Sequence, residues 1–387
     1  MLPTFCPIPY GRQQISEADK QAVLAALAHP YLTQGPRISQ FEEAFATYVG
    51  AKGGVAVSNG TAALHLCALA LGVQAGHKVI TSPLTFAASA NCVLYAGGDI
   101  HFADIDPQTG LLDIEAVREL LTTSPKGSFQ GIIPVDFMGS PVRMDEFRAL
   151  ADEFDLWLIE DSCHAPGSQY QDQQGEWQRC GNGRYADLSI FSFHPVKHIA
   201  CGEGGMVTGQ NEVLLDKIRQ LRHHGITRDP GLLTENHGGW YYEMQHLGYN
   251  YRLTDIQAAL GISQLEGAQA GVERRRAIAK RYDEAFAGSS IHSFSQLPWQ
   301  RSAYHLYVVQ VPNRKEVYDG LREAGIYPQI HYIPLHLQPF YRDKGWKKGD
   351  FLHAEQYYSS CLSLPMFPSL TDEQQAYVIE QLQRLVG

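Results

Sequence analysis

The chain has 387 residues, of which 44% are hydrophobic and 19% are charged, so it holds ample apolar material for buried layers and little sign of disorder. Its length exceeds what one small core accommodates and predicts a large domain with a smaller one. The formal net charge of −10 argues against a nucleic-acid surface, because phosphate backbones are bound by clustered Lys and Arg side chains.

The cysteines and the N-terminus bear on the cellular compartment. Seven cysteines are scattered without a C-x-x-C pair, which favours a reducing environment over a disulfide or zinc framework. The first residues lack a basic segment followed by an apolar one, and no run of about eighteen consecutive apolar residues occurs. We therefore expect a cytoplasmic protein with no metal centre and no membrane span.

In chain order, the first predicted element is a helix over residues 17–27, followed by a turn-rich loop at 31–36 that could reach across a site. From about residue 54 onward, short apolar runs alternate with helical segments such as 61–71 and 213–221. This is the pattern of a mostly parallel sheet covered on both faces by helices. The seven predicted strands are residues 55–57, 79–80, 100–102, 132–135, 156–159, 188–191 and 206–208.

The pattern changes after about residue 263. A charged helix over 273–286 leads to a β run at 304–309, and a final helix is predicted over 372–385. We therefore expect an N-terminal segment and large domain over residues 1–262 and a small C-terminal α/β domain over 263–387.

Polar and small residues follow two of the early strands, where ligands of open α/β sheets collect. Ser58 to Thr61 open a predicted helix, whose free N–H groups suit a phosphate, although the same residue types are ordinary helix caps. Phe86 follows the next strand and could either stack on a planar ligand or belong to the core.

Asp161 closes a predicted strand next to Glu160. Because strand side chains alternate, the two carboxylates should point to opposite faces, and one of them should face a site. Asp161 could cap a turn or bind a cofactor; a metal site with Cys163 and His164 is a poorer interpretation, since no second ligand cluster accompanies it. His164 is better explained as a partner of Asp161 or as packing against a cofactor.

Lys197 lies in an apolar, glycine-rich stretch with few carboxylates nearby, where desolvation would lower its pKa and make its amine a nucleophile and proton carrier. Together, Asp161 and Lys197 predict a pyridoxal phosphate (PLP) enzyme: the lysine forms a Schiff base with the cofactor aldehyde, and the aspartate keeps the ring nitrogen protonated. Ser192 could donate to the cofactor phosphate. The glycines at 202–205 lack the Lys-Ser/Thr of a P-loop.

These segments, with residues 32–36, 41–42 and 248–253, give nearly the whole chain a resemblance to the sugar aminotransferases of the DegT/DnrJ/EryC1/StrS family. The resemblance implies the type I PLP-dependent transferase fold, with a mostly parallel seven-stranded sheet between helices in the large domain. It also implies PLP as cofactor, pyridoxamine phosphate (PMP) as its intermediate form, and L-glutamate as the amino donor.

The same resemblance assigns roles to single residues. Lys197 would be the Schiff-base lysine, Asp161 the partner of the pyridine nitrogen and Phe86 the stacking ring. Asn250 would contact the cofactor phosphate in the other subunit, which implies a homodimer with shared active sites. The phosphate contacts within one subunit would be Thr61, Ala62 and Ser192.

Residues 135–139, 192–197 and 331–335 look most like the branch of the family that acts in pseudaminic acid biosynthesis. Asp136, where related enzymes often carry histidine, supports this branch. It implies amination at C4 of a UDP-linked 4-keto-6-deoxy-N-acetylhexosamine, giving UDP-4-amino-4,6-dideoxy-N-acetyl-β-L-altrosamine; another nucleotide-linked keto-deoxysugar is the alternative. Candidate substrate residues are Tyr10, Gln34, His331, Tyr332 and His336.

Two other classes use the same chemistry or fold. Sugar dehydratases of this fold replace the Schiff-base lysine with histidine, and Lys197 opposes that assignment. A non-catalytic PLP-binding regulator would be expected to lose Asp161 or Lys197, and both are present.

Overall fold

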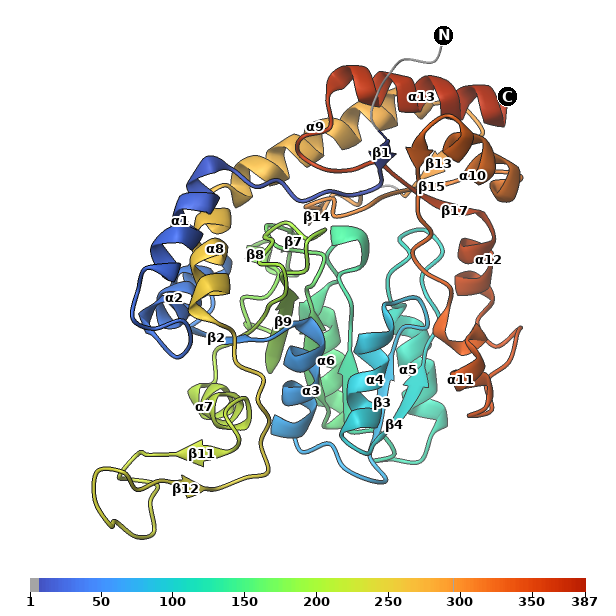
Figure 1. Cartoon of the computed structure of the whole chain (residues 1–387). Helices are drawn as coiled ribbons and strands as arrows, with labels where there is room; N and C mark the ends of the chain where they lie inside the picture. Colours follow the sequence, from blue (N-terminus) through green and yellow to red (C-terminus); the bar gives the residue numbers. More distant parts are fainter. Residues whose placement is uncertain (1–6, 295) are drawn as a thin grey trace.

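The computed structural model describes residues 7–294 and 296–387. Its centre is a seven-stranded sheet (Figure 1) in which β10 is antiparallel to both of its neighbours and the remaining pairs are parallel. All seven strands predicted from the sequence belong to this sheet, and its mostly parallel character is confirmed. In spatial order the strands are β2 (Gly53–Val57), β10 (Gly205–Gly209), β9 (Leu188–Ser192), β6 (Trp157–Asp161), β5 (Gly131–Ile133), β3 (Lys78–Thr81) and β4 (Asp99–Phe102).

Sequence chemistry explains how these strands end and what covers them. Strand β5 stops at Ile133, earlier than predicted, because Pro134 has no N–H to continue the ladder. Strands β9 and β10 are buried along their whole length, as expected of strands with both faces covered. The helices that connect the strands are α3 (Gly60–Ala70), α4 (Ala87–Tyr95), α5 (Ile114–Thr123), α6 (Met144–Phe154) and α7 (Glu212–Leu221).

The N-terminal helices pack on a helix at the end of the predicted large domain, which runs across its boundary at residues 262/263 (Figure 1). Ser16 caps the first of them in a reciprocal capping box with Asp19, and Thr254 caps the third in the same way. The Asp255 carboxylate accepts hydrogen bonds from the backbone N–H groups of Gly35 and Arg37, at 2.8 and 3.0 Å, and so holds the start of the second helix. These helices are α1 (Glu17–Leu27), α2 (Pro36–Val49) and α8 (Asp255–Glu266).

A second hydrophobic core lies in the C-terminal part of the chain. It is built on a three-stranded antiparallel sheet, whose middle strand begins later than predicted, after Tyr304 adopts a positive φ of 49°. The sheet contains β13 (His292–Ser293), β15 (Tyr307–Gln310) and β17 (Cys361–Leu364), and its helices are α9 (Ala268–Phe286), α10 (Arg314–Glu323) and α13 (Asp372–Val386).

Two segments cross between these two cores. Strand β1 (Ile8–Pro9) pairs in parallel with β16 (Ile326–Tyr327) of the C-terminal part. Conversely, Tyr341 and Tyr357 of the C-terminal part pack into the core of the large domain. We propose that the large and small domains divide near residues 262/263, apart from strand β1 and the residues that pack across between the two cores. Residues 1–6 lie outside the described part of the chain.

The remaining elements are short. Residues 222–252 form an arm that projects from the body of the molecule (Figure 1) and carries several exposed apolar side chains. Within the described residues, no helix is long and apolar enough to cross a membrane. The short elements are β7 (Gln169–Gln171), β8 (Trp177–Arg179), β14 (Gln300–Arg301), β11 (Ile226–Thr227), β12 (Glu243–Met244), η1 (Phe137–Gly139), η2 (Leu335–Leu337), α11 (Pro339–Arg342) and α12 (Leu352–Ser360).

Replacing Gly205 with alanine should destabilise the large domain. A Cβ at this position would lie 2.5 Å from the carbonyl oxygen of Asn59 and 2.9 Å from the backbone nitrogen of Gly60, so strand β10 and the start of α3 would have to separate. We expect a loss of about 1–3 kcal/mol in the free energy of unfolding.

The matched control is Gly271→Ala in α9, where the new Cβ meets Pro368 at 3.6 Å. This substitution should stabilise the protein by up to about 1 kcal/mol. Urea unfolding of both variants measures the difference, and equal stability of the two would show that the close approach of β10 to α3 does not require glycine.

Candidate active site

A cavity of about 750 Å³ opens where strands β6 and β9 end, which is the edge at which open α/β sheets bind ligands. Its wall includes residues from both parts of the chain, because the small-domain residues His331 and Tyr332 face the large domain there. The structure therefore brings together most of the site residues expected from the sequence: Tyr10, Thr61, Ala62, Phe86, Asp161, His164, Ser192, Lys197, His331 and Tyr332.

The start of α3 forms one end of the cavity. Asn59 caps this helix, since its side chain accepts a hydrogen bond of 2.8 Å from the Ala62 N–H. A Cβ on Gly60 would lie 3.0 Å from the Cβ of Ser192, so glycine lets the helix start approach strand β9 closely. Both interpretations of this segment therefore hold in part: Asn59 is a cap, and the neighbouring helix-start N–H groups lie beside the cavity, where they suit an anion.

Asp161 lies on the cavity floor at the end of β6, and its carboxylate is held in place from two sides. The Ser89 hydroxyl donates to Oδ2 at 2.7 Å, and the Cys163 backbone N–H donates to Oδ1 at 3.2 Å. Glu160 points to the opposite side of the strand and accepts from Ser189 at 2.7 Å. The Glu160 and Asp161 side chains therefore point to opposite faces of the strand, as predicted. The sequence did not reveal Ser89, because a serine among small residues at the start of helix α4 carries no signal of its own.

Lys197 follows β9 and is partly enclosed by the protein. Burial lowers the pKa of its amine, while Cys163 and Asp161 oppose this effect to a smaller extent. A lowered pKa increases the fraction of neutral amine near neutral pH, and only the neutral amine is a nucleophile or a proton acceptor.

Three buried imidazoles surround the same cavity. The rings of His164 and His305 lie 4.3 Å apart, and His331 Nδ1 meets the Ser363 hydroxyl at 2.8 Å. Burial lowers the pKa of His164 and His305 well below the usual range and that of His331 to about 3. All three are therefore neutral under physiological conditions. His305 was not found from the sequence, because it lies in a run that indicates only a strand.

Three predicted site residues lie outside this cavity. Gln34 and Asn250 are exposed at other places on the surface of the subunit. His336 is fully buried, and its Nε2 lies 2.9 Å from Glu355 Oε1. The prediction that His336 lines a substrate pocket is therefore corrected, because its ring points into the protein. The neighbouring residues in the sequence do not reveal that orientation.

The fold and the cavity are those of a PLP-dependent sugar aminotransferase. The chain belongs to the DegT/DnrJ/EryC1/StrS aminotransferase family, whose model matches residues 13–383. This membership confirms the family expected from the sequence and the aminotransferase class over the dehydratase and regulator alternatives.

Relatives and solved structures cover almost the whole chain. It is 37% identical to the spore coat polysaccharide biosynthesis protein SpsC of Bacillus subtilis, over 98% of this chain and 97% of SpsC. It is 36% identical to the UDP-4-amino-4,6-dideoxy-N-acetyl-beta-L-altrosamine transaminase of Campylobacter jejuni, over 97% of this chain and 96% of that protein.

The cofactor follows from structural similarity. The PMP form of Streptococcus pneumoniae Spr1654 matches with a TM-score of 0.90 at 28% identity, over 98% of this chain and 99% of that one. The same protein is known in a PLP form. The present protein uses PLP, with PMP as the intermediate form, and acts on nucleotide-linked sugars with an amino donor.

The neutral histidines predict a loss of stability in acid. Each has a pKa in the folded protein below the unfolded value of about 6.5, so its contribution is present above that pH and is lost as pH falls towards about 3 for His331. The free energy of unfolding should fall by up to about 1.4 kcal/mol per pH unit for each such histidine. Urea unfolding across this range measures the slope. His331→Asn should reduce it and the exposed His292→Asn should leave it unchanged; an unaltered slope in His331→Asn would refute the assignment.

Proposed function

We propose that the cavity residues hold PLP in the way the sequence resemblance implies. The fit has a physical basis: the cavity is lined by a helix start that suits the phosphate, by a carboxylate held by two hydrogen bonds and by a desolvated amine. When bound, the cofactor supplies an electron sink for negative charge at the carbon that loses a proton. The side chains of this protein supply the placement of that group and the proton transfers.

Lys197 is the residue that carries protons. Its amine, with a pKa lowered by burial, would accept the proton from the Cα of the amino donor and act as the acid that gives it back, while the cofactor would supply the electron sink. The same group performs the reverse transfer when the keto sugar is the acceptor. The Asp161 carboxylate, fixed by Ser89 and Cys163, would accept a hydrogen bond from the protonated ring nitrogen of the cofactor.

The remaining contacts fix the position and plane of the cofactor. The backbone N–H group of Thr61 and the Ser192 hydroxyl would hold the phosphate. Ala62 would lie beside it, since its own N–H donates to the Asn59 side chain. Phe86 is 59% exposed although it lines the cavity, so its ring is available to stack on a planar group. His164, whose Nε2 lies 3.3 Å from the Tyr332 hydroxyl, packs beside the cofactor and links the large domain to the small one.

The substrate we propose is a UDP-linked 4-keto-6-deoxy-N-acetylhexosamine, aminated at C4 with glutamate as donor to give UDP-4-amino-4,6-dideoxy-N-acetyl-β-L-altrosamine. The similarity to the Campylobacter jejuni transaminase supports this assignment. Tyr10, His331 and Tyr332 form the wall that would contact the sugar. The comparable similarity to SpsC favours a second candidate, another nucleotide-linked keto-deoxysugar.

We also propose a homodimer in which Asn250 completes the site of the other subunit. Within its own subunit, Asn250 lies outside the cavity, at the base of the projecting arm. The arm exposes 74% of Trp240, 65% of Met244 and 79% of Leu247, which is a costly arrangement unless another surface covers it. A second copy of the chain is the partner that the shared-site proposal requires.

A substrate panel tests the proposed reaction. Purified enzyme with glutamate should convert UDP-linked 4-keto-6-deoxy sugars and form 2-oxoglutarate, because the sugar nitrogen comes from glutamate. Lys197→Ala is the control: it should lose turnover by several orders of magnitude and should no longer show the absorbance change that glutamate causes in the wild-type cofactor. Turnover confined to dTDP-linked sugars would reject the UDP assignment and support the second candidate.

Mixing two inactive variants tests the shared site. A dimer of one Lys197→Ala subunit and one Asn250→Ala subunit would contain one intact site only if Asn250 serves the partner. Random reassortment should then restore up to roughly a quarter of wild-type activity, since half the dimers are mixed and each has one working site. If Asn250 acts within its own subunit, no mixed dimer has an intact site and mixing restores nothing.

A further inference from the structure

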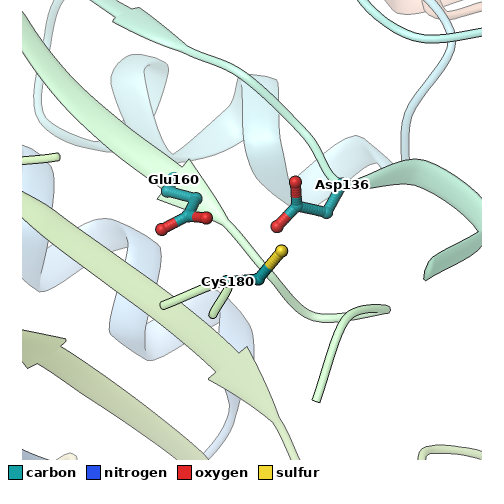
Figure 2. Close-up of side chains that lie close together, drawn as sticks. All are labelled: Asp136, Glu160 and Cys180. Carbon is teal, nitrogen blue, oxygen red and sulfur yellow. The ribbon is translucent and has the colours of Figure 1, made fainter. Parts of the chain in front are cut away.

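Two carboxyl groups are buried together behind the cofactor cavity. Asp136 follows strand β5, Glu160 lies in β6 on the face opposite Asp161, and the thiol of Cys180 completes the group. Figure 2 shows their polar atoms turned toward one another, and these atoms lie within 4.8 Å of each other. The three residues are 0%, 3% and 1% exposed, so water cannot screen their charges.

The hydrogen bonds of this group leave one oxygen without a partner. Asp136 accepts from the Val142 N–H at 3.0 Å through Oδ1 and from the Ser162 hydroxyl at 2.8 Å through Oδ2. Both hydrogen bonds of Glu160 end on Oε2, and they come from the Gly181 N–H at 3.0 Å and the Ser189 hydroxyl at 2.7 Å. In the described part of the chain, Glu160 Oε1 has no hydrogen-bond partner.

The surroundings offer no positive charge to the pair. Among residues 7–294 and 296–387, no Lys, Arg or His forms an ion pair with Asp136 or Glu160. The titratable neighbours are Cys180 and Tyr170, and burial raises the pKa of both, which keeps them neutral. The charge of Glu160 is the one that acts on Asp136, and the nearby Asp145 is paired with Arg143. Two adjacent unpaired carboxylates would be very costly in this setting.

A bound proton fits the hydrogen bonding of these two carboxyl groups better than a metal ion does. Three of the four carboxylate oxygens already accept from an N–H or O–H donor, and the open oxygen needs one hydrogen. A zinc or calcium ion would need four or more ligand atoms and, for zinc, a deprotonated Cys180. Burial raises the pKa of Asp136 well above its usual range, and the charge of Glu160 adds to this effect. Burial also raises the pKa of Glu160.

We propose that Asp136 and Glu160 share one proton and that this pair is a positioning element for Asp161. The connection is direct: the Asp136 N–H donates to the carbonyl oxygen of Asp161 at 3.0 Å, and the Asp136 carboxylate holds Ser162, the residue after Asp161. The positioning part of this inference rests on the proposed role of Asp161. The shared proton does not, so the two can fail separately.

Glu160→Gln tests the shared proton in the full-length protein as purified. Its carboxamide can place an N–H where Oε1 lies and keep an oxygen for Gly181 and Ser189, so it supplies the hydrogen at every pH. In the wild type, the raised pKa of the folded protein makes the stabilisation complete below the unfolded value of about 4.3 and diminishes it as pH rises through the folded value. The melting temperature of Glu160→Gln relative to wild type should therefore increase with pH.

The matched control is Glu42→Gln, another buried glutamate. Glu42 has a cationic partner, Arg222, and also accepts from the Ala56 N–H at 2.8 Å, so its substitution should lower the melting temperature throughout. The infrared band of a protonated carboxylic acid should be present in wild type and Glu42→Gln and absent in Glu160→Gln. The shared proton would be overturned if the difference in melting temperature between Glu160→Gln and wild type did not depend on pH and the wild type lacked this band. It would also be overturned if the wild type held a stoichiometric divalent metal that Glu160→Gln releases.

Positioning is tested by Glu160→Ala against Glu160→Gln. Without the pair, the segment around Asp161 loses one of its supports, although Ser89 and Cys163 still hold the carboxylate. PLP affinity should therefore fall several-fold with a shifted cofactor absorbance, and Glu160→Gln should restore both. Unchanged affinity and absorbance in Glu160→Ala would overturn the positioning role. Failure of the proposed role of Asp161 itself would be seen separately, as an unaltered cofactor spectrum in Asp161→Asn.

Discussion

The parallel pairing of β6 with β9 is the interaction on which the site depends. Asp161 lies opposite Ile190 in this pairing, so the ends of both strands meet at one edge of the sheet. Asp161 ends one strand, Ser192 ends the other, and the segment with Lys197 follows Ser192. The side chains proposed to hold the ring nitrogen, the phosphate and the aldehyde of the cofactor therefore lie along this edge.

Exclusion of water gives the same site its chemistry. Burial lowers the pKa of Lys197 and of the surrounding histidines, because it disfavours a positive charge. On the other face of β6, burial raises the pKa of Asp136 and Glu160, because it disfavours a negative one. One strand thus separates a region where burial lowers the pKa of bases from a region where burial raises the pKa of acids, and Asp161 lies at their boundary.

Local sequence patterns were sufficient to predict the main strands and helices of the fold. The strands are short apolar runs and the helices begin at capping residues such as Ser16 and Thr254, so both depend on neighbours in the sequence. The contact of Ser89 with Asp161 and the tilted ring contact of His305 with His164 join segments far apart in the chain. Their residue types are common in loops and strands, so no local pattern distinguishes them, and the burial of His336 was hidden for the same reason.

By itself, the sequence determined the cofactor class and the strand order along the chain, because each depends on residue types at fixed local spacing; the same spacing predicts Lys197 as the reactive lysine. Tertiary structure alone decided which carboxylate of Glu160 and Asp161 faces the cavity, which histidines are neutral and which acids lie together. The physical reason is that side-chain charge depends on desolvation, and desolvation is produced by distant segments that come together only in the folded chain.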